Sequence, residues 1–401
     1  MDRPSRVRVS GPLAPYAAGF REDLARRGYS PWTATAHLQL MEHVSRWLVL
    51  ERLGPGGLTT AAAQRFLLDR RASGQVRLLS VRGLAPLLGY LRGLGVVPDA
   101  AQVAADGPLE RLLAAFADYL ISERGLSEST VCYYRSVSRR FLSPWRRPDG
   151  VAFEDLTAAE VRGFVLDERR QRSVGSVKNS VTALRALLRF AYLRRYTDTP
   201  LDAAAPAAAW WRGGSMPQVL RAEHLVRLLG SCDRRTAVGC RDYAILVVLS
   251  RLGLRACEVV ALTVDDVDWR AGEILVSGKG ARRERLPLPV DVGEALADYC
   301  RRGRDRGGCR RLFLSVRAPY AGLSPSAANK VVARACEHAG LAPVGAHRLR
   351  HSAAAAMRRA GAPLVEIGQV LRHQHPATTA RYGKVDAIEL AVLARPWPGA
   401  A

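Results

Sequence analysis

The sequence contains few lysines, and arginine carries nearly all of its positive charge. Only four of the 60 basic residues are lysine, namely Lys178, Lys279, Lys330 and Lys384. Arginine presents a planar fork that can bind two phosphate oxygens at once, whereas lysine is a point charge. A GC-rich coding sequence would raise arginine and alanine together without any functional cause, and we attribute most of the bias to that. Each lysine that remains is therefore a residue of interest.

The sequence also lacks a paired cysteine motif. Its seven cysteines, at positions 132, 232, 240, 257, 300, 309 and 336, include no pair with the CxxC spacing of a zinc or redox site. Cys257 and Cys336 lie within apolar helical patterns and are predicted to be core residues. We expect a reducing, cytoplasmic environment with no structural disulfide, no metal and no cofactor.

No apolar run is long enough to span a membrane, and the first residues lack the core of a signal peptide. What the chain has instead is a formal charge of +23, from 60 basic and 37 acidic side chains. Such an excess favours a polyanionic partner, and nucleic acid is favoured over an anionic membrane surface.

The first half of the sequence shows signs of an internal duplication. The stretch from Phe20 resembles the stretch from Phe116, residues 58–71 resemble 156–170, and residues 84–98 resemble 184–200. The offset stays near one hundred residues, as tandem copies of one domain would give. Ser30 and Ser127 are predicted to be helix N-caps, and Gly28 and Gly125 are predicted to end the preceding helices.

The sequence predicts two tandem helical bundles, at 1–103 and 104–205, and a mixed α+β domain at 218–401. Linkers are expected at 101–107 and 203–217, the second being rich in Ala, Pro and Gly. In the last domain, residues 272–289 predict strand, turn and strand, while helices are predicted at 239–262, 324–340, 347–360 and 363–372. The predicted fold class is therefore mostly α with a small β-sheet.

Six residues of the last domain could carry chemistry, although each has an ordinary interpretation. Arg255 and Glu258 lie one helical turn apart and could simply pair. Lys279, between two glycines on the predicted turn, could donate a proton to a leaving oxygen or merely be exposed. His347 and Arg350 should project from one helix face. His373 precedes a turn, and most tyrosines, Tyr382 included, serve only packing.

Taken together, these residues resemble a known pattern. The order GLRxxE, GKGxxRxRLPLP, HxLRH and LxHxxxxTTxxY is similar to the catalytic domain of the tyrosine recombinase (phage integrase) family. The resemblance covers residues 217 to about 395. Residues 104–205 also look like the SAM-like, core-binding helical domain of that family, and the helical domain at 1–103 is extra relative to its two-domain members. This extra domain could be an arm-site DNA reader, a longer clamp on the same duplex or a contact surface for neighbouring protomers.

The resemblance implies a catalytic set of Arg255, Lys279, His347, Arg350, His373 and Tyr382. Tyr382 would attack a phosphate of double-stranded DNA, Arg255 and Arg350 would bind its oxygens, and His373 would add a hydrogen bond. Lys279 would be the general acid, with His347 assisting proton transfer. The expected reaction needs no metal or nucleotide. The resemblance also implies a homotetramer on paired DNA sites and leaves room for an accessory directionality protein.

The sequence departs from the family pattern beside the last histidine. The family usually has glycine there, whereas this chain has Arg372, which could tighten a phosphate contact or alter the helix end. His375 replaces a small residue. A mobile-element integrase or transposase is the leading interpretation. The alternatives are a chromosome-dimer resolvase, a DNA-binding regulator that does not cut, and a type IB topoisomerase.

Overall fold

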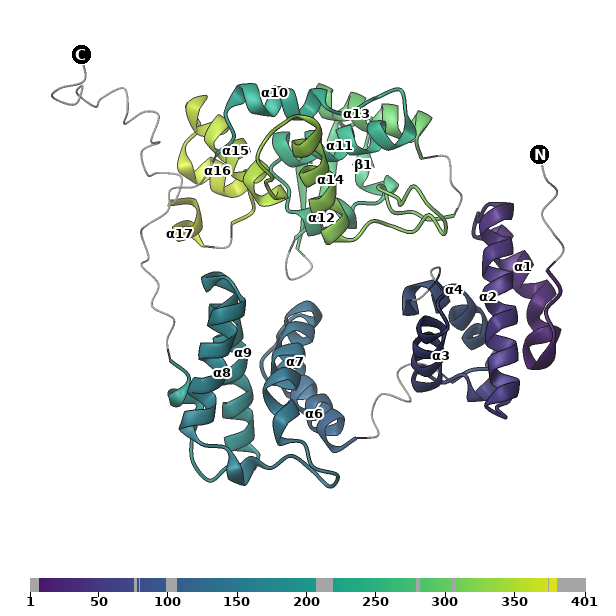
Figure 1. Cartoon of the computed structure of the whole chain (residues 1–401). Coiled ribbons are helices and arrows are strands. Elements are labelled where there is room, and N and C mark those ends of the chain that lie inside the picture. Colours follow the sequence, from purple (N-terminus) through teal and green to yellow (C-terminus); the bar gives the residue numbers. More distant parts are fainter. Residues whose placement is uncertain are drawn as a thin grey trace, which may run out of the picture. The chain divides into compact units, whose positions relative to one another are not determined.

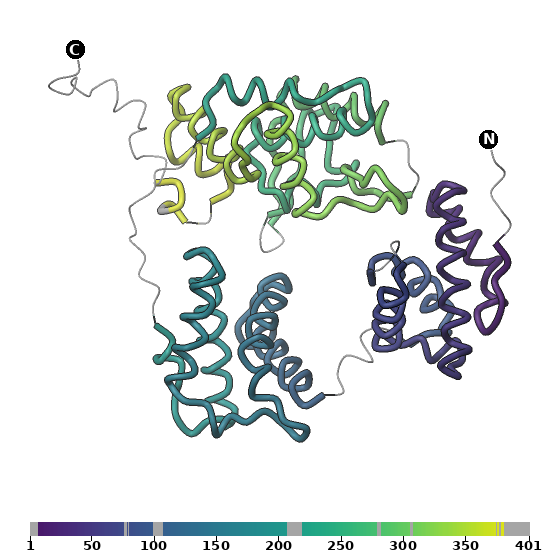
Figure 2. Tube along the Cα trace, viewed as in Figure 1, coloured from purple at the N-terminus to yellow at the C-terminus, as the bar shows by residue number. Residues whose placement is uncertain are grey.

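The computed structural model describes residues 7–75, 78, 80–98, 107–206, 219–278, 282–304, 308–373 and 375–380. The chain divides by its contacts into two compact units, and Figure 1 labels the helices and strands that they contain. The first contains residues 1–23 and 32–212, and the second contains residues 24–31 and 213–401. The chain trace in Figure 2 shows that the described parts of the first unit are built from helices.

Among the described residues, the N-terminal part of the chain contains four α-helices, besides two short 3-10 helices. The α-helices are α1 (Ala17–Arg26), α2 (Pro31–Leu50), α3 (Thr60–Ala72) and α4 (Val81–Gly93). Two aromatic contacts hold these helices together. The rings of Phe20 and Tyr90 lie 5.4 Å apart, and the rings of Trp47 and Phe66 lie 5.8 Å apart.

A second set of four helices follows. They are α6 (Pro108–Ser122), α7 (Glu128–Leu142), α8 (Ala158–Gln171) and α9 (Val174–Leu193). This set has a core of its own, in which Phe116 lies against Phe190 with 5.2 Å between ring centroids. Phe141 and Phe164 join α7 to α8 at the same distance.

The ends of these helices follow the chemistry of their sequence. Gly28 and Gly125 have φ angles of 77° and 59°, in the left-handed region that glycine enters most easily, and they end their helices as predicted. Ser127 is the N-cap of α7 as predicted, although its side chain makes no capping hydrogen bond. Thr59 and Thr157 cap α3 and α8 by accepting a backbone N–H bond.

The second unit combines helices with a small sheet. Its helices are α10 (Ala222–Gly230), α11 (Ala237–Arg251), α12 (Ala256–Ala261), α13 (Val290–Arg302), α14 (Pro325–His338), α15 (Ala346–Arg359), α16 (Leu364–Val370) and α17 (Pro376–Thr379). The strands β1 (Val267–Asp268), β2 (Glu273–Ser277) and β3 (Arg283–Pro287) form an antiparallel sheet in the order β1-β2-β3. The predicted fold class is confirmed, and β2 and β3 are the predicted strands.

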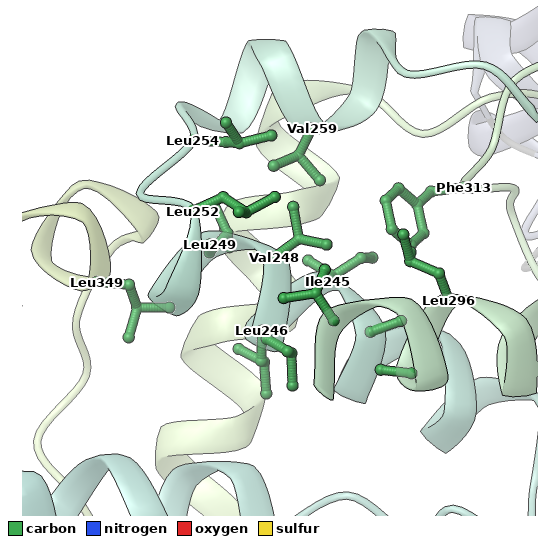
Figure 3. Packing of buried hydrophobic residues seen from close by; sticks show 14 of the residues in the cluster. Ile245, Leu246, Val248, Leu249, Leu252, Leu254, Val259, Leu296, Phe313 and Leu349 are labelled. Carbon is green, nitrogen blue, oxygen red and sulfur yellow. The ribbon is translucent and has the colours of Figure 1, made fainter. Parts of the chain in front are cut away.

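The core of this unit is centred on α11, whose apolar residues face several neighbours at once. Figure 3 shows Ile245, Leu246, Val248 and Leu249 of this helix among the buried side chains of the cluster. Leu296 from α13 and other apolar side chains pack around them. A helix that is apolar on most of its surface is buried on most of its surface, and α11 therefore anchors the elements that carry the site.

Two details differ from the sequence predictions. The helix predicted over 239–262 is broken after Arg251, because Gly253 adopts a φ of 59° and α12 begins only at Ala256. Cys257 is exposed and not in the core, since the short α12 turns Glu258, Val259 and Val260 inward instead. Cys336 is buried as predicted. Within the described residues, no helix has the length and apolar character needed to cross a membrane.

Candidate active site

Arg255 occupies the N-cap of α12, directly after the chain reverses at Gly253. Its backbone N–H donates to Oε2 of Glu258 at 2.8 Å, and its Nη1 donates to Oε1 of the same carboxylate at 2.7 Å. The predicted pairing of Arg255 with Glu258 is therefore confirmed. The Arg255 side chain remains 36% exposed, so part of its guanidinium can still meet a ligand.

Glu258 is the centre of a cluster of arginines and is only 3% exposed. Besides Arg255, Arg372 donates from Nη2 to Oε2 at 2.7 Å, and Nη1 of Arg350 lies 3.9 Å from that oxygen. Burial raises the pKa of this carboxyl. The hydrogen bond from the Arg255 backbone and the charges of Arg372 and Arg255 outweigh burial, so its pKa lies below the ordinary value.

Arg350 projects from α15 and is 1% exposed. Its Nη1 donates to the carbonyl oxygen of Gly253 at 2.6 Å, and its Nη2 donates to the carbonyl oxygen of Leu371. These two bonds connect the turn before α12 to the end of α16. They also fix the plane of the guanidinium.

His373 follows α16, and its Nδ1 lies 2.8 Å from Oγ1 of Thr379 on α17. Thr379 comes this close because Gly368 has no side chain, and a Cβ there would lie 2.9 Å from the same hydroxyl oxygen. Burial lowers the pKa of His373 to about 4, with help from the charges of Arg350 and Arg255. The imidazole is therefore neutral near pH 7 and can donate one hydrogen bond.

His347 lies on α15 one turn before Arg350. Its ring stands edge-on to that of His351, with 4.3 Å between the centroids. His347 also acts on His373 electrostatically, which places the two histidines in one neighbourhood. His351 thus belongs to the surroundings of the site through its contact with His347.

Lys279 and Tyr382, the remaining two predicted residues, lie outside the described residues. Lys279 follows Gly278, whose N–H donates to the carbonyl of Arg282 at 2.7 Å between β2 and β3. Tyr382 comes after Ala380, which is the last described residue and directly follows α17.

The structure thus brings together four of the six predicted residues, Arg255, His347, Arg350 and His373, from three separate segments of the chain. Sequence reasoning did not assign the central role to Glu258, nor the contacts made by Arg372 and Thr379. The signals available were the spacing between Arg255 and Glu258 and an arginine where the family has glycine. Among the described residues, no group of three His, Cys, Asp or Glu side chains is placed to hold a metal ion.

Two family models match the chain. Residues 218–388 match the phage integrase family, and residues 113–195 match the phage integrase N-terminal SAM-like domain. One curated relative is y4rA of Sinorhizobium fredii (strain NBRC 101917 / NGR234), described as a candidate integrase/recombinase. It is 41% identical to this chain over 98% of the chain and 96% of its own length.

A second relative is the tyrosine recombinase XerD of Listeria monocytogenes serotype 4b (strain F2365). It is 29% identical over 70% of this chain and 95% of its own length. Among solved structures, a lambda integrase dimer bound to a core site has a TM-score of 0.53 at 19% identity, over 72% of this chain and 96% of that one. This likeness shows the fold.

The fold is that of the tyrosine recombinase catalytic domain. The chain belongs to the phage integrase family, and it is an enzyme of the tyrosine recombinase type.

Proposed function

We propose that this enzyme cleaves and rejoins double-stranded DNA at a specific site through a 3′-phosphotyrosyl intermediate formed on Tyr382. The observation that supports the proposal is the gathering of Arg255 and Arg350 around one buried carboxylate, with His373 near enough for both charges to lower its pKa. Two guanidinium groups and a neutral imidazole in one place suit the developing negative charge of a phosphoryl-transfer transition state. Hydrogen bonds to Glu258 and to backbone carbonyls hold the two guanidinium groups in place before DNA binds.

In the proposed first step, the phenol oxygen of Tyr382 attacks phosphorus, the bond to the 5′-oxygen breaks, and a 5′-hydroxyl leaves. Arg255 and Arg350 donate to the non-bridging oxygens. His373, neutral near pH 7 because its pKa is about 4, donates a further hydrogen bond. Arg350 is almost fully covered in this structure, so we expect groups around it to move when the phosphate enters.

Proton transfer is assigned to the other two residues. Lys279 protonates the departing 5′-oxygen, and His347 accepts the proton of the tyrosine. Because the phosphodiester energy is kept in the phosphotyrosyl bond, a 5′-hydroxyl from another strand can attack it. The reversed step then joins the strands without a nucleotide cofactor.

The N-terminal helices support a mobile-element role. The relative y4rA matches along nearly the whole chain, whereas XerD covers 70% of it. We therefore propose that residues 1–103 and 104–205 are tandem copies of one DNA-binding module, and that the extra copy serves the recognition of element ends. Four protomers act together on paired sites, with an accessory directionality protein as a further partner.

The decisive experiment uses a nicked duplex that carries the target site and traps the covalent intermediate. The target site is sought first among repeats that flank the gene. The wild-type protein should form a denaturant-resistant adduct with this DNA, and Tyr382→Phe should form none while it retains DNA binding. As a matched control, Tyr243→Phe, on α11, should form the adduct at the wild-type rate.

An adduct that survives in Tyr382→Phe would overturn the assignment of the nucleophile. If the wild-type protein binds the site and forms no adduct, the DNA-binding regulator becomes the better hypothesis. Relaxation of supercoiled DNA without strand exchange would instead favour the topoisomerase.

A further inference from the structure

Arg372 lies at an uncommon place for a residue with a side chain. Its φ is 54°, in the left-handed region that L-residues rarely adopt. The backbone around it forms the two hydrogen bonds of a Schellman helix end. The N–H of Arg372 donates to the carbonyl of Gln369 at 2.8 Å, and the N–H of His373 donates to that of Gly368 at 3.0 Å. Glycine would suit this position better.

The side chain of Arg372 is nevertheless buried, with only 4% of it exposed. Its Nη2 donates to Oε2 of Glu258 at 2.7 Å, and its Nη1 donates to the carbonyl of Val370 at 2.9 Å. The contact with Glu258 joins two segments that are more than a hundred residues apart in sequence. It provides a reason for an arginine to remain where the backbone favours glycine.

The position of the turn matters for both neighbouring site residues. The residue before Arg372 is Leu371, whose carbonyl accepts a hydrogen bond from Arg350. The residue after it is His373. Any displacement of this turn would therefore move a hydrogen-bond partner of Arg350 and the imidazole of His373 together.

We propose that Arg372 is a positioning residue that ties the Leu371–His373 turn to Glu258, and so aligns His373 and Arg350 with Arg255. Arg372 acts through Glu258 and touches no reacting atom. The effect of Arg372 on the reaction rests on the proposed function, whereas its effect on the position of the turn does not.

The charges around His373 provide a separate readout. Burial is the largest cause of the lowered pKa of this histidine. Four neighbouring groups lower it further, namely Arg350 and His347 on α15, Arg255 at the start of α12 and the adjacent Arg372. Glu258 is the acidic group of the cluster, and Thr379 is the hydrogen-bond partner. Removing Arg372 removes one of the positive charges, so the pKa of His373 should rise.

The test compares Arg372→Gly with the wild-type protein in adduct formation on the nicked duplex and in the NMR titration of His373. Because a small displacement of catalytic groups costs much rate, we expect adduct formation to slow about 10- to 100-fold with DNA affinity unchanged. The pKa of His373 should rise. Arg372→Lys, which keeps the charge, should recover part of both effects.

A double-mutant cycle with Glu258→Gln tests whether Arg372 acts through the carboxylate. In the Glu258→Gln background, Arg372→Gly should slow adduct formation by less than about two-fold, because the link is already lost. Additive losses would show that Arg372 acts by another route and would overturn the proposal.

Arg235 supplies the matched control. It is an exposed arginine of the second unit, and its Nε donates to Oδ1 of Asp233 at 2.9 Å. Arg235→Gly should leave the adduct rate and the His373 titration at wild-type values. If Arg372→Gly behaves in the same way, the proposal is wrong. If the wild-type protein forms no adduct, the proposed function has failed. Hydrogen exchange of the His373 N–H, which donates to the carbonyl of Gly368, then tests the position of the turn by itself, because this N–H should lose protection in Glu258→Gln and unchanged protection would overturn the proposal.

Discussion

The two sets of four helices in the first unit share their apolar contacts and differ in their polar ones. The aromatic pair Phe20–Tyr90 joins α1 to α4, and Phe116–Phe190 joins α6 to α9. The side-chain hydrogen bonds between helices differ. Trp47 donates to Asp69 in the first set, whereas in the second a buried Glu168 accepts hydrogen bonds from Ser180 and Arg140.

Their charges differ as well. Residues 1–103 contain 14 basic and 7 acidic side chains, a net charge of +7, and residues 104–205 contain 16 and 13, a net charge of +3. An apolar framework constrains the helix packing, while surface charge is free to change with the ligand. The difference indicates that the two sets meet DNA with unequal electrostatic strength.

The largest effect is expected from the shared aromatic pair. Phe190 is 1% exposed, so Phe190→Ala should destabilise the second set by about 3–5 kcal/mol, through lost contacts and a cavity. Tyr90→Ala removes a half-buried ring, and its cost should be smaller, about 1–2 kcal/mol. Denaturant unfolding followed by hydrogen exchange of each set measures both. Equal losses would show that the two pairs are energetically alike despite their different burial.

Removal of residues 1–103 is the next largest change. The truncated protein should bind its DNA site about 10- to 100-fold more weakly, with a shallower dependence on salt, because fewer counterions are released. Residues 24–31 group with the second unit, so the thermal stability of the truncated protein must be measured first. Unchanged affinity and salt dependence in a stable truncated protein would contradict a DNA-binding role for the first set.

The sequence predicted features that depend on residues close together in the chain better than features that depend on contacts between distant segments. The β2 and β3 strands and most helices follow local patterns, and the pairing of Arg255 with Glu258 follows from their spacing. The break at Gly253 was missed because one residue with a positive φ interrupts an otherwise continuous apolar pattern. Glu258 as a shared partner of Arg255 and Arg372 could not be predicted, since that contact depends on how distant segments pack.

Histidine gives the two sets different responses to pH. The first set contains His37 and His43, and residues 104–205 contain no histidine. Burial lowers the pKa of both histidines below 6.5, and the charge of Arg70 lowers that of His43 further. The folded state therefore disfavours protonation. The two histidines therefore cost no stability above pH 6.5, and the free energy of unfolding falls as the pH drops below that value, because the unfolded chain binds the protons first.

Hydrogen exchange between pH 7.5 and 5.5 should thus show α2 losing protection while α7 keeps it, after correction for intrinsic rates. The double variant His37→Gln and His43→Gln should remove most of this pH dependence. Equal pH responses of the two helices in the wild-type protein would rule out the histidines as its source.

The smallest effect is expected at the equivalent helix caps, where the two sets should behave alike. The Thr59 hydroxyl accepts from the N–H of Ala62, and the Thr157 hydroxyl accepts from that of Ala159, each at 3.2 Å. Either Thr→Ala change should cost about 1 kcal/mol, because one N–H at the helix start loses its partner. Thr→Ser at the same positions keeps the hydroxyl and serves as the control. The Thr157 hydroxyl also donates to Glu160, so losses at the two caps that differ by more than about 1 kcal/mol would show that this extra bond separates the two sets even at their helix ends.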